Sequence, residues 1–133
     1  MFNQLNIFKR KTFPVASQKQ ITEPTTPTGE SSIMRTLPAY LAYLGSSKYA
    51  PSTTEKYFAD VKKLSVFLQK KNVGEITMHD VQQWMAGLVT PQGEKLDKKT
   101  INRKVSAIIT YFSWLMAIGA ITTDPTAGID NQR

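Results

Sequence analysis

Hydrophobic residues recur at helical spacing between residues 98 and 118, and polar residues fill the positions between them. At a step of about 100° per residue, one stripe holds the apolar side chains of Ile101, Val105, Ile108, Phe112 and Leu115, flanked by Ile109 and Met116. The opposite side holds the polar side chains of Lys99, Asn102, Arg103, Ser106, Thr110 and Ser113. This pattern predicts an amphipathic helix that ends at Gly119 and packs Phe112 into a core.

A first helix is predicted at about residues 33–46, where apolar residues share one face. Pro38 is expected in its opening turn or at the start of a shorter helix, because a helix tolerates proline best in its first turn. The residues that share the face are Ile33, Leu37, Tyr40, Leu41 and Leu44.

A second predicted helix opens at Pro51 and ends near Asn72 or Gly74. Ser52 and Glu55 have the spacing of a capping box at its start. Its buried stripe is expected to hold Tyr57, Val61, Leu64 and Leu68.

A third predicted helix is capped by Thr77, with Asp80 three residues later. Residues 89–96 are expected to form a turn-rich loop, and residues 121–129 allow one short turn. The apolar face of the third helix consists of Val81, Trp84, Met85 and Leu88.

The organisation that follows is one helical domain with a tail. No segment alternates apolar and polar residues as a strand does, so the predicted fold class is all-α, a bundle of four helices. Residues 14–32 are rich in Pro, Thr, Ser and Gln, and we therefore expect residues 1–32 to form a flexible tail or linker. The folded domain is expected over residues 33–130.

The charge balance narrows the class of partner. The chain has 17 Lys and Arg residues against 10 Asp and Glu residues, a net charge of +7. Residues 1–32 contribute four cations and two anions, so most of the excess lies in the predicted helical domain. Such a balance favours a polyanionic partner.

Residue counts exclude several kinds of chemistry. The chain has no cysteine and one histidine, His79, so a disulfide framework, a thiolate nucleophile and a multi-histidine metal site are ruled out. We expect no cofactor. The apolar runs are too short to span a bilayer, and the N-terminal cations follow an apolar segment, the reverse of their order in a secretory signal. We therefore expect a cytoplasmic protein with no membrane partner.

The polar side of the helix at residues 98–118 has two interpretations. Lys99, Asn102 and Arg103 lie near the helix start, where they could contact phosphates and base edges of DNA. Polar residues opposite an apolar stripe also occur on any surface helix. In that case the chain would be a helical adaptor whose Trp and Tyr residues anchor a protein partner.

A self-sufficient enzyme is not supported, because no acid, base and nucleophile lie at a suitable spacing. Tyr111 lies between aromatic neighbours and has no histidine or clustered arginines to activate a phenol with a pKa of about 10. We predict a packing role for Tyr111 and a surface position for His79.

Four blocks of sequence, taken in order, resemble a known family. They are APSTTEKYFADVKKLSVFL (50–68), EITMHDVQQWM (75–85), KKTINRKVSAIITYFSWL (98–115) and GAITTDPTAGI (119–129). They resemble the core-binding domain of tyrosine recombinases, the phage integrase and Xer group, over about residues 33–130. The resemblance implies a small four-helix SAM-like bundle that closes one side of a clamp on duplex DNA.

In that family the second and fourth helices usually face the DNA. Tyr57 is set aside as a core tyrosine with a solvated hydroxyl, because it lies at the centre of an apolar stripe. Carried over to this chain, the resemblance implies the DNA-binding candidates Lys48, Ser52, Thr53, Lys56, Lys62, Lys63, Lys98, Lys99, Thr100, Asn102, Arg103 and Ser106.

The family's catalytic machinery, a nucleophilic tyrosine with arginines and histidine, lies in a separate C-terminal domain that residues 1–133 do not show. The resemblance therefore implies a non-catalytic module for DNA integration or recombination, with duplex DNA as its partner and no small-molecule substrate. The parent recombinase is expected to oligomerise on DNA.

Overall fold

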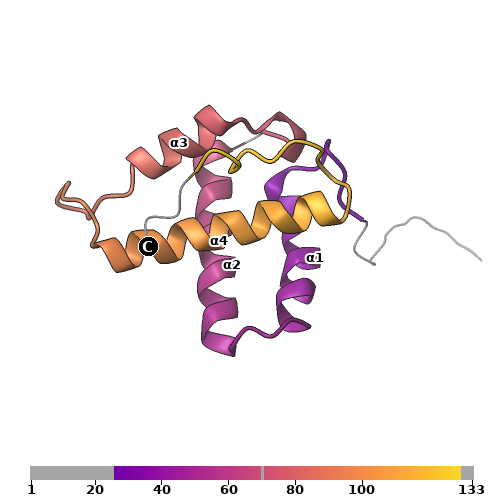
Figure 1. Ribbon diagram of the computed structural model, residues 1–133, viewed down its shortest axis with the longest axis horizontal. Helices are drawn as coiled ribbons and strands as arrows, with labels where there is room; N and C mark the ends of the chain where they lie inside the picture. Colours follow the sequence, from indigo (N-terminus) through magenta and orange to yellow (C-terminus); the bar gives the residue numbers. More distant parts are fainter. Residues whose placement is uncertain (1–25, 70, 130–133) are drawn as a thin grey trace, which may run out of the picture.

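The computed structural model describes residues 26–69 and 71–129 (Figure 1). Within these ranges the chain is helical and pairs in extended form only at two isolated bridges, so the all-α class is confirmed. The helices are α1 (Ile33–Gly45), α2 (Pro51–Leu68), the 3-10 helix η1 (Val73–Glu75), α3 (Met78–Ala86) and α4 (Lys98–Ala117).

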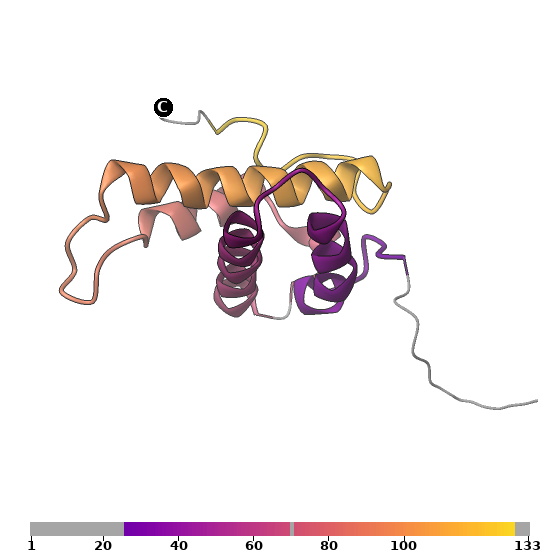
Figure 2. The ribbon, with the colours of Figure 1, turned by 90° about the horizontal axis from the view of Figure 1, so that it is seen from below.

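The helices form two layers. In Figure 1, α1 and α2 run antiparallel and side by side, and α4 crosses both of them. The view from below in Figure 2 shows the α1–α2 hairpin on one side of α4, with α3 beside the first half of α4. The core lies where α4 crosses the hairpin.

Aromatic rings fill the crossing of α1 and α4. Tyr40, Tyr111 and Phe112 are fully buried, and the rings of Tyr40 and Tyr111 meet edge to face with their centroids 5.0 Å apart. The Tyr111 hydroxyl and Thr36 Oγ1 share a hydrogen bond of 2.6 Å. Burial raises the pKa values of Tyr40 and Tyr111 well above their usual range. The predicted packing roles of Tyr111 and Phe112 are confirmed.

The buried face of α4 is wider than the predicted stripe. Val105, Ile108, Phe112 and Leu115 are buried as predicted, whereas Ile101 is half-buried and Met116 is exposed. The stripe widens because α4 packs on α1 as well as on α2. The additional buried residues are Lys104, Ala107, Tyr111 and Trp114.

The ends of α1 and α4 follow local chemistry. Ser32 caps α1 by accepting a hydrogen bond from the backbone N–H of Arg35. Pro38 lies inside α1 and not in its opening turn, so that prediction was wrong; the cap fixes the helix start at Ile33, and the exposed proline costs one backbone bond. At the end of α4, Gly119 takes a φ of 80°. The N–H of Ala120 then binds the carbonyl of Leu115 in a Schellman motif.

The predicted start of α2 at Pro51 is confirmed, whereas its predicted cap and its predicted end need correction. The helix begins with Pro51 in its first turn and Ala50 as the capping residue, and no side chain caps it. Pro51 takes the first helical position, which suits its fixed φ and missing N–H, and Ser52 therefore lies inside the first turn. The predicted capping box with Glu55 is absent. The helix ends at Leu68, earlier than predicted, because the chain from Asn72 pairs with the segment before α1.

That segment was expected to belong to the linker. The N–H of Val73 donates to the carbonyl of Ser31 at 2.8 Å, and the N–H of Gly74 donates to the carbonyl of Gly29 at 2.9 Å. A Cβ atom at Gly74 would lie 2.8 Å from the carbonyl oxygen of Gly29, so this backbone approach requires glycine. Residues 29–31 are therefore tied to η1, while residues 1–25 of the predicted tail lie outside the described ranges.

The third helix begins as predicted. Thr77 Oγ1 accepts from the N–H of Asp80, and the Asp80 carboxylate accepts from the N–H of Thr77, which completes the capping box. Lys71 binds the same carboxylate at 2.6 Å. Among the described residues, no helix is both long enough and apolar enough to cross a membrane.

Candidate nucleic-acid interface

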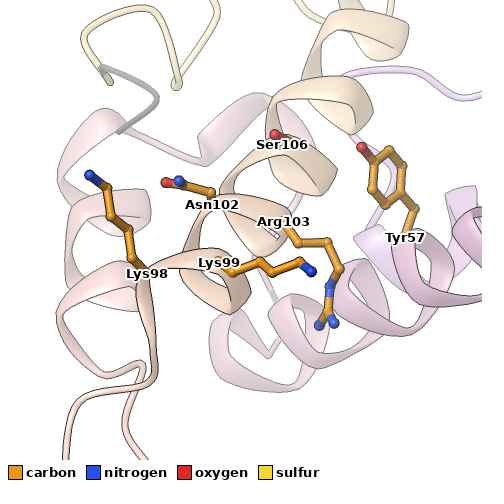
Figure 3. Close-up of a pocket in the computed structure, with 6 residues that line it drawn as sticks. All are labelled: Tyr57, Lys98, Lys99, Asn102, Arg103 and Ser106. Atoms are coloured by element: carbon orange, nitrogen blue, oxygen red, sulfur yellow. The ribbon is translucent and has the colours of Figure 1, made fainter. Parts of the chain in front are cut away.

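An open hollow of about 550 Å³ lies at the start of α4. Figure 3 shows the six residues that line it, of which five come from α4 and one from α2. Asp97 Oδ1 accepts from the N–H of Thr100 at 2.7 Å and fixes the first turn of α4; this bond lowers the Asp97 pKa. The lining residues are Tyr57, Lys98, Lys99, Asn102, Arg103 and Ser106.

The side chains around the hollow point in two directions. In Figure 3 the Lys99 ammonium and the Arg103 guanidinium extend toward α2 and Tyr57. Lys98 and Asn102 extend to the other side, where both also line a second hollow of about 610 Å³ between α3, the preceding loop and α4. The first two turns of α4 therefore present cations to both sides of the helix.

The structure brings together five of the twelve candidates from the sequence, those of α4 other than Thr100. Thr100 is half-buried and uses its N–H in the cap. The α2 candidates do not line this hollow; Thr53 is half-buried, and the others are exposed, as is Lys48 in the loop before α2. Those exposed α2 candidates are Ser52, Lys56, Lys62 and Lys63.

The lysines of α2 lie on different edges of the helix. Asp60 faces α4, because it binds Lys104, and Ser65 faces α1, because its hydroxyl contacts Met34. Residues three or four positions apart are neighbours on a helix. Lys63 therefore lies on the α4 edge, one turn after Asp60, whereas Lys62 lies on the α1 edge, one turn before Ser65.

Tyr57 combines the predicted packing role with a position in the lining of the hollow. It packs against the hydrophobic core, yet it is only partly buried and lines the hollow opposite Arg103. Its position in the stripe of α2 predicted the packing. Its exposure depends on where α4 crosses α2, which no local pattern encodes.

Sequence reasoning missed an ion cluster beneath the hollow. Asp60 is 1% exposed and Lys104 is 8% exposed, and Lys104 Nζ lies 2.8 Å from Asp60 Oδ1. Arg103 Nε lies 3.5 Å from Asp60 Oδ2. A signal was present, because Asp60 immediately precedes Val61 of the α2 stripe and Lys104 immediately precedes Val105 of the α4 stripe. A buried acid on one helix needs a cation on another.

Asn102 has an unusual environment for a surface amide. Its Oδ1 is buried and has no hydrogen-bond partner among the described residues. The amide lies between the two hollows and lines both. An amide that lines a cationic hollow is the type of side chain that contacts a base edge.

The structure places Tyr111 and His79, the two residues that were weighed for catalytic or metal chemistry. Tyr111 is sealed in the core with a raised pKa, and His79 is exposed in the first turn of α3, as predicted. No group of three or more His, Asp or Glu residues in the described ranges could hold a metal ion. The cations that line the hollow at the start of α4 favour the binding of anions.

Comparison with known proteins agrees with this architecture. Residues 37–119, more than half of the chain, match the family described as "Phage integrase, N-terminal SAM-like domain", and the chain belongs to that family. The resemblance noted from the sequence is thereby confirmed.

Two groups of curated relatives are similar to this chain. Proteins named "Tyrosine recombinase XerC" from two strains of Lactobacillus delbrueckii subsp. bulgaricus are 30% identical over 100 residues, which cover 71% of this chain and 32% of the relative. The protein of the same name from Xylella fastidiosa is 29% identical over 77 residues, covering 58% of this chain and 26% of the relative. The chain thus spans about a third or less of the length of these relatives. No solved structure gives a significant match.

Proposed function

We propose that this chain is a DNA-binding module of a site-specific tyrosine recombinase, and that its α4 start contacts duplex DNA. The observation that carries the proposal is that Lys98, Lys99, Arg103 and the amide of Asn102 all lie in the first two turns of α4 and line one hollow. Guanidinium and ammonium groups bind phosphate, and an amide can pair with an adenine edge in the major groove. The relatives named as tyrosine recombinases supply the class of reaction.

The module binds and positions DNA in this proposal, and a separate catalytic domain of a longer recombinase performs strand exchange. Assembly of several recombinase copies on DNA and a cytoplasmic location belong to the same proposal. With Tyr111 buried, incubation of this chain with supercoiled plasmid should give no covalent protein–DNA adduct. An adduct on Tyr111 would contradict its assignment to packing.

The structure weakens the alternative of a protein adaptor held by aromatic anchors. Trp84 and Trp114 are only 6% and 7% exposed, and Tyr40 and Tyr111 are fully buried. These four rings hold the bundle together, so they are not available to a partner. The tyrosines that remain accessible, each 37% exposed, are Tyr43 and Tyr49.

Titration with DNA tests the proposal. The full chain is added to a fluorescein-labelled duplex of mixed sequence, about three helical turns long, and anisotropy is recorded between about 50 and 200 mM salt. We expect binding that weakens steeply as salt rises, because Lys and Arg contacts release counterions from the phosphates. Undetectable binding at low salt, or affinity independent of salt, would refute the proposed function.

Asn102 gives the proposal a specificity test. Asn102→Ala should reduce the difference in affinity between duplexes of different sequence more than it reduces affinity itself, because the amide would read a base edge. The comparison needs at least two duplexes that the parent chain distinguishes. An equal loss on every duplex would assign Asn102 to the phosphate backbone.

A further inference from the structure

A buried carboxylate lies directly behind the cations of the hollow. Asp60 of α2 receives two cations from adjacent positions of α4, with Lys104 Nζ 2.8 Å from Oδ1 and Arg103 Nε 3.5 Å from Oδ2. The Asp60 side chain is 2% exposed. The buried carboxylate of Asp60 therefore links α2 to the first two turns of α4.

The two ion pairs differ in kind. The Lys104 side chain is 10% exposed and donates a hydrogen bond to Asp60, which is enough to compensate one buried carboxylate. The Arg103 side chain is 36% exposed. Its Nε and Asp60 Oδ2 are both buried, and neither has a hydrogen-bond partner in the described part of the chain. Arg103 therefore contacts Asp60 through its Nε, although Lys104 already neutralises the charge of that carboxylate.

A guanidinium held at Nε still presents its two terminal nitrogens. Figure 3 shows that end of Arg103 extending away from α4, on the same side as the Lys99 ammonium. A long side chain whose rotamer is fixed before binding loses less conformational entropy when it meets its ligand. The planar fork of arginine also binds phosphate in a defined orientation.

We propose that Asp60 is a positioning residue, whose carboxylate holds the Nε edge of Arg103 so that the terminal nitrogens stand beside Lys99 for a DNA phosphate. This inference rests on the proposed function. Simple electrostatics predicts the opposite effect, since an acid near the DNA backbone should weaken binding. The sign of the change on removing the acid therefore separates the two accounts.

The variants must avoid a buried lysine without a counter-charge, which Asp60→Asn alone would create. Lys104→Met keeps the length of the side chain and leaves Asp60 paired with Arg103. Adding Asp60→Asn to Lys104→Met then removes the hold on Arg103 alone. Glu55→Gln, at an exposed acid near the start of α2, controls for the loss of one negative charge on the same helix.

Affinity is measured on the full chain with the same labelled mixed-sequence duplex, and circular dichroism confirms that each variant is folded. We expect the Asp60→Asn, Lys104→Met chain to bind at least about threefold more weakly than Lys104→Met, although it has one negative charge fewer. Glu55→Gln should bind as tightly as the parent or slightly more tightly. In the Arg103→Ala chain Lys104 still pairs with Asp60, and adding Asp60→Asn together with Lys104→Met to it should have no further effect on affinity.

A second variant tests the proposal without touching the buried acid. Arg103→Lys keeps the charge but cannot present a fork while held at Nε, so we expect it to lose most of the affinity that Arg103→Ala loses. An Arg103→Lys chain that binds like the parent would overturn the proposal. The proposal would also be overturned if the Asp60→Asn, Lys104→Met chain bound DNA as tightly as Lys104→Met. It would equally be overturned if the same two changes lowered DNA affinity by the same factor in a chain that already carries Arg103→Ala. In all these cases the parent still binds DNA and the proposed function stands, whereas a parent chain that binds no DNA would refute both.

Discussion

The two halves of α4 have different surroundings although they form one continuous helix. In the first half, Lys98 and Lys99 are exposed and Asn102 and Arg103 are half-buried around a cationic hollow. In the second half, Tyr111, Phe112 and Leu115 are completely buried against the α1–α2 hairpin. Figure 2 shows the reason, because the start of α4 extends beyond α2 while the rest crosses the hairpin. Crossing position, more than amphipathic pattern, decides which half packs and which half is available for binding.

The strongest test of this division is the removal of Phe112. Phe112→Ala should lower the free energy of unfolding by about 3 to 5 kcal/mol, because a fully buried ring is lost and a cavity remains. Ser113→Ala, at the exposed neighbouring position, is the matched control and should stay within about 0.5 kcal/mol of the parent. Denaturant unfolding measures both. A loss below about 1 kcal/mol for Phe112→Ala would contradict the packing of the second half.

Substitutions of the two buried tyrosines, Tyr40 and Tyr111, test the packing around the second half of α4 in more detail. Tyr111→Phe removes a buried hydrogen bond to Thr36 and should cost about 1 kcal/mol. Tyr40→Phe removes a buried hydroxyl that has no hydrogen-bond partner within residues 26–69 and 71–129, so it should be neutral or stabilising. Denaturant unfolding of the pair gives the contrast. A larger cost for Tyr40→Phe than for Tyr111→Phe would reverse these assignments.

Alkaline pH should destabilise the packed half. Burial raises the pKa values of Tyr40 and Tyr111 above the ordinary value of 10.0, so the folded chain keeps both protons where the unfolded chain loses them. The contribution of these two tyrosines to the free energy of unfolding is therefore fully present below pH 10.0 and is lost as the pH rises further. Thermal unfolding across this range checks the direction. A chain with both tyrosines changed to Phe should show a flatter dependence on pH.

The first half should affect binding without affecting folding. Lys99→Ala should change the free energy of unfolding by no more than about 0.5 kcal/mol, weaken DNA binding severalfold and make the salt dependence shallower by about one unit. Arg35→Ala, at an exposed cation of α1, is the charge-matched control. Equal losses of affinity in both variants would indicate attraction by net charge alone. Arg103→Ala is a less clean probe of binding, since it also removes the contact with Asp60.

The smallest expected effect concerns the extent of the interface on α2. Lys63→Ala should reduce DNA affinity slightly, whereas Lys62→Ala should not, because the two neighbouring lysines lie on opposite edges of α2. Both remove one exposed positive charge, so they control for each other in the anisotropy titration. If Lys62→Ala is the weaker binder, the DNA lies across the α1 side of the hairpin and not against α4.

Local sequence signals predicted the elements well where the chemistry is local. The spacing of Ile108, Phe112 and Leu115 predicted the buried side of α4, and Thr77 with Asp80 predicted the start of α3. The same reasoning failed at α2, where Ser52 and Glu55 matched a capping pattern but Pro51 takes the first helical position and places Ser52 inside the helix. It also failed at residues 29–31, whose composition suggested a linker but whose backbone pairs with η1.

The sequence by itself determined that the chain is basic, all-α and without cysteine chemistry, and it located the cations at the start of α4. These properties follow from composition and from a period of 3.6 residues, which act over a few turns of one helix. Only the tertiary structure decided that Asp60 lies under Arg103 and Lys104, residues more than 40 positions away. It also decided that Tyr57 faces the hollow and that Lys62 and Lys63 occupy different edges. Such relations depend on where one helix crosses another, and crossing geometry is set by packing of the whole core.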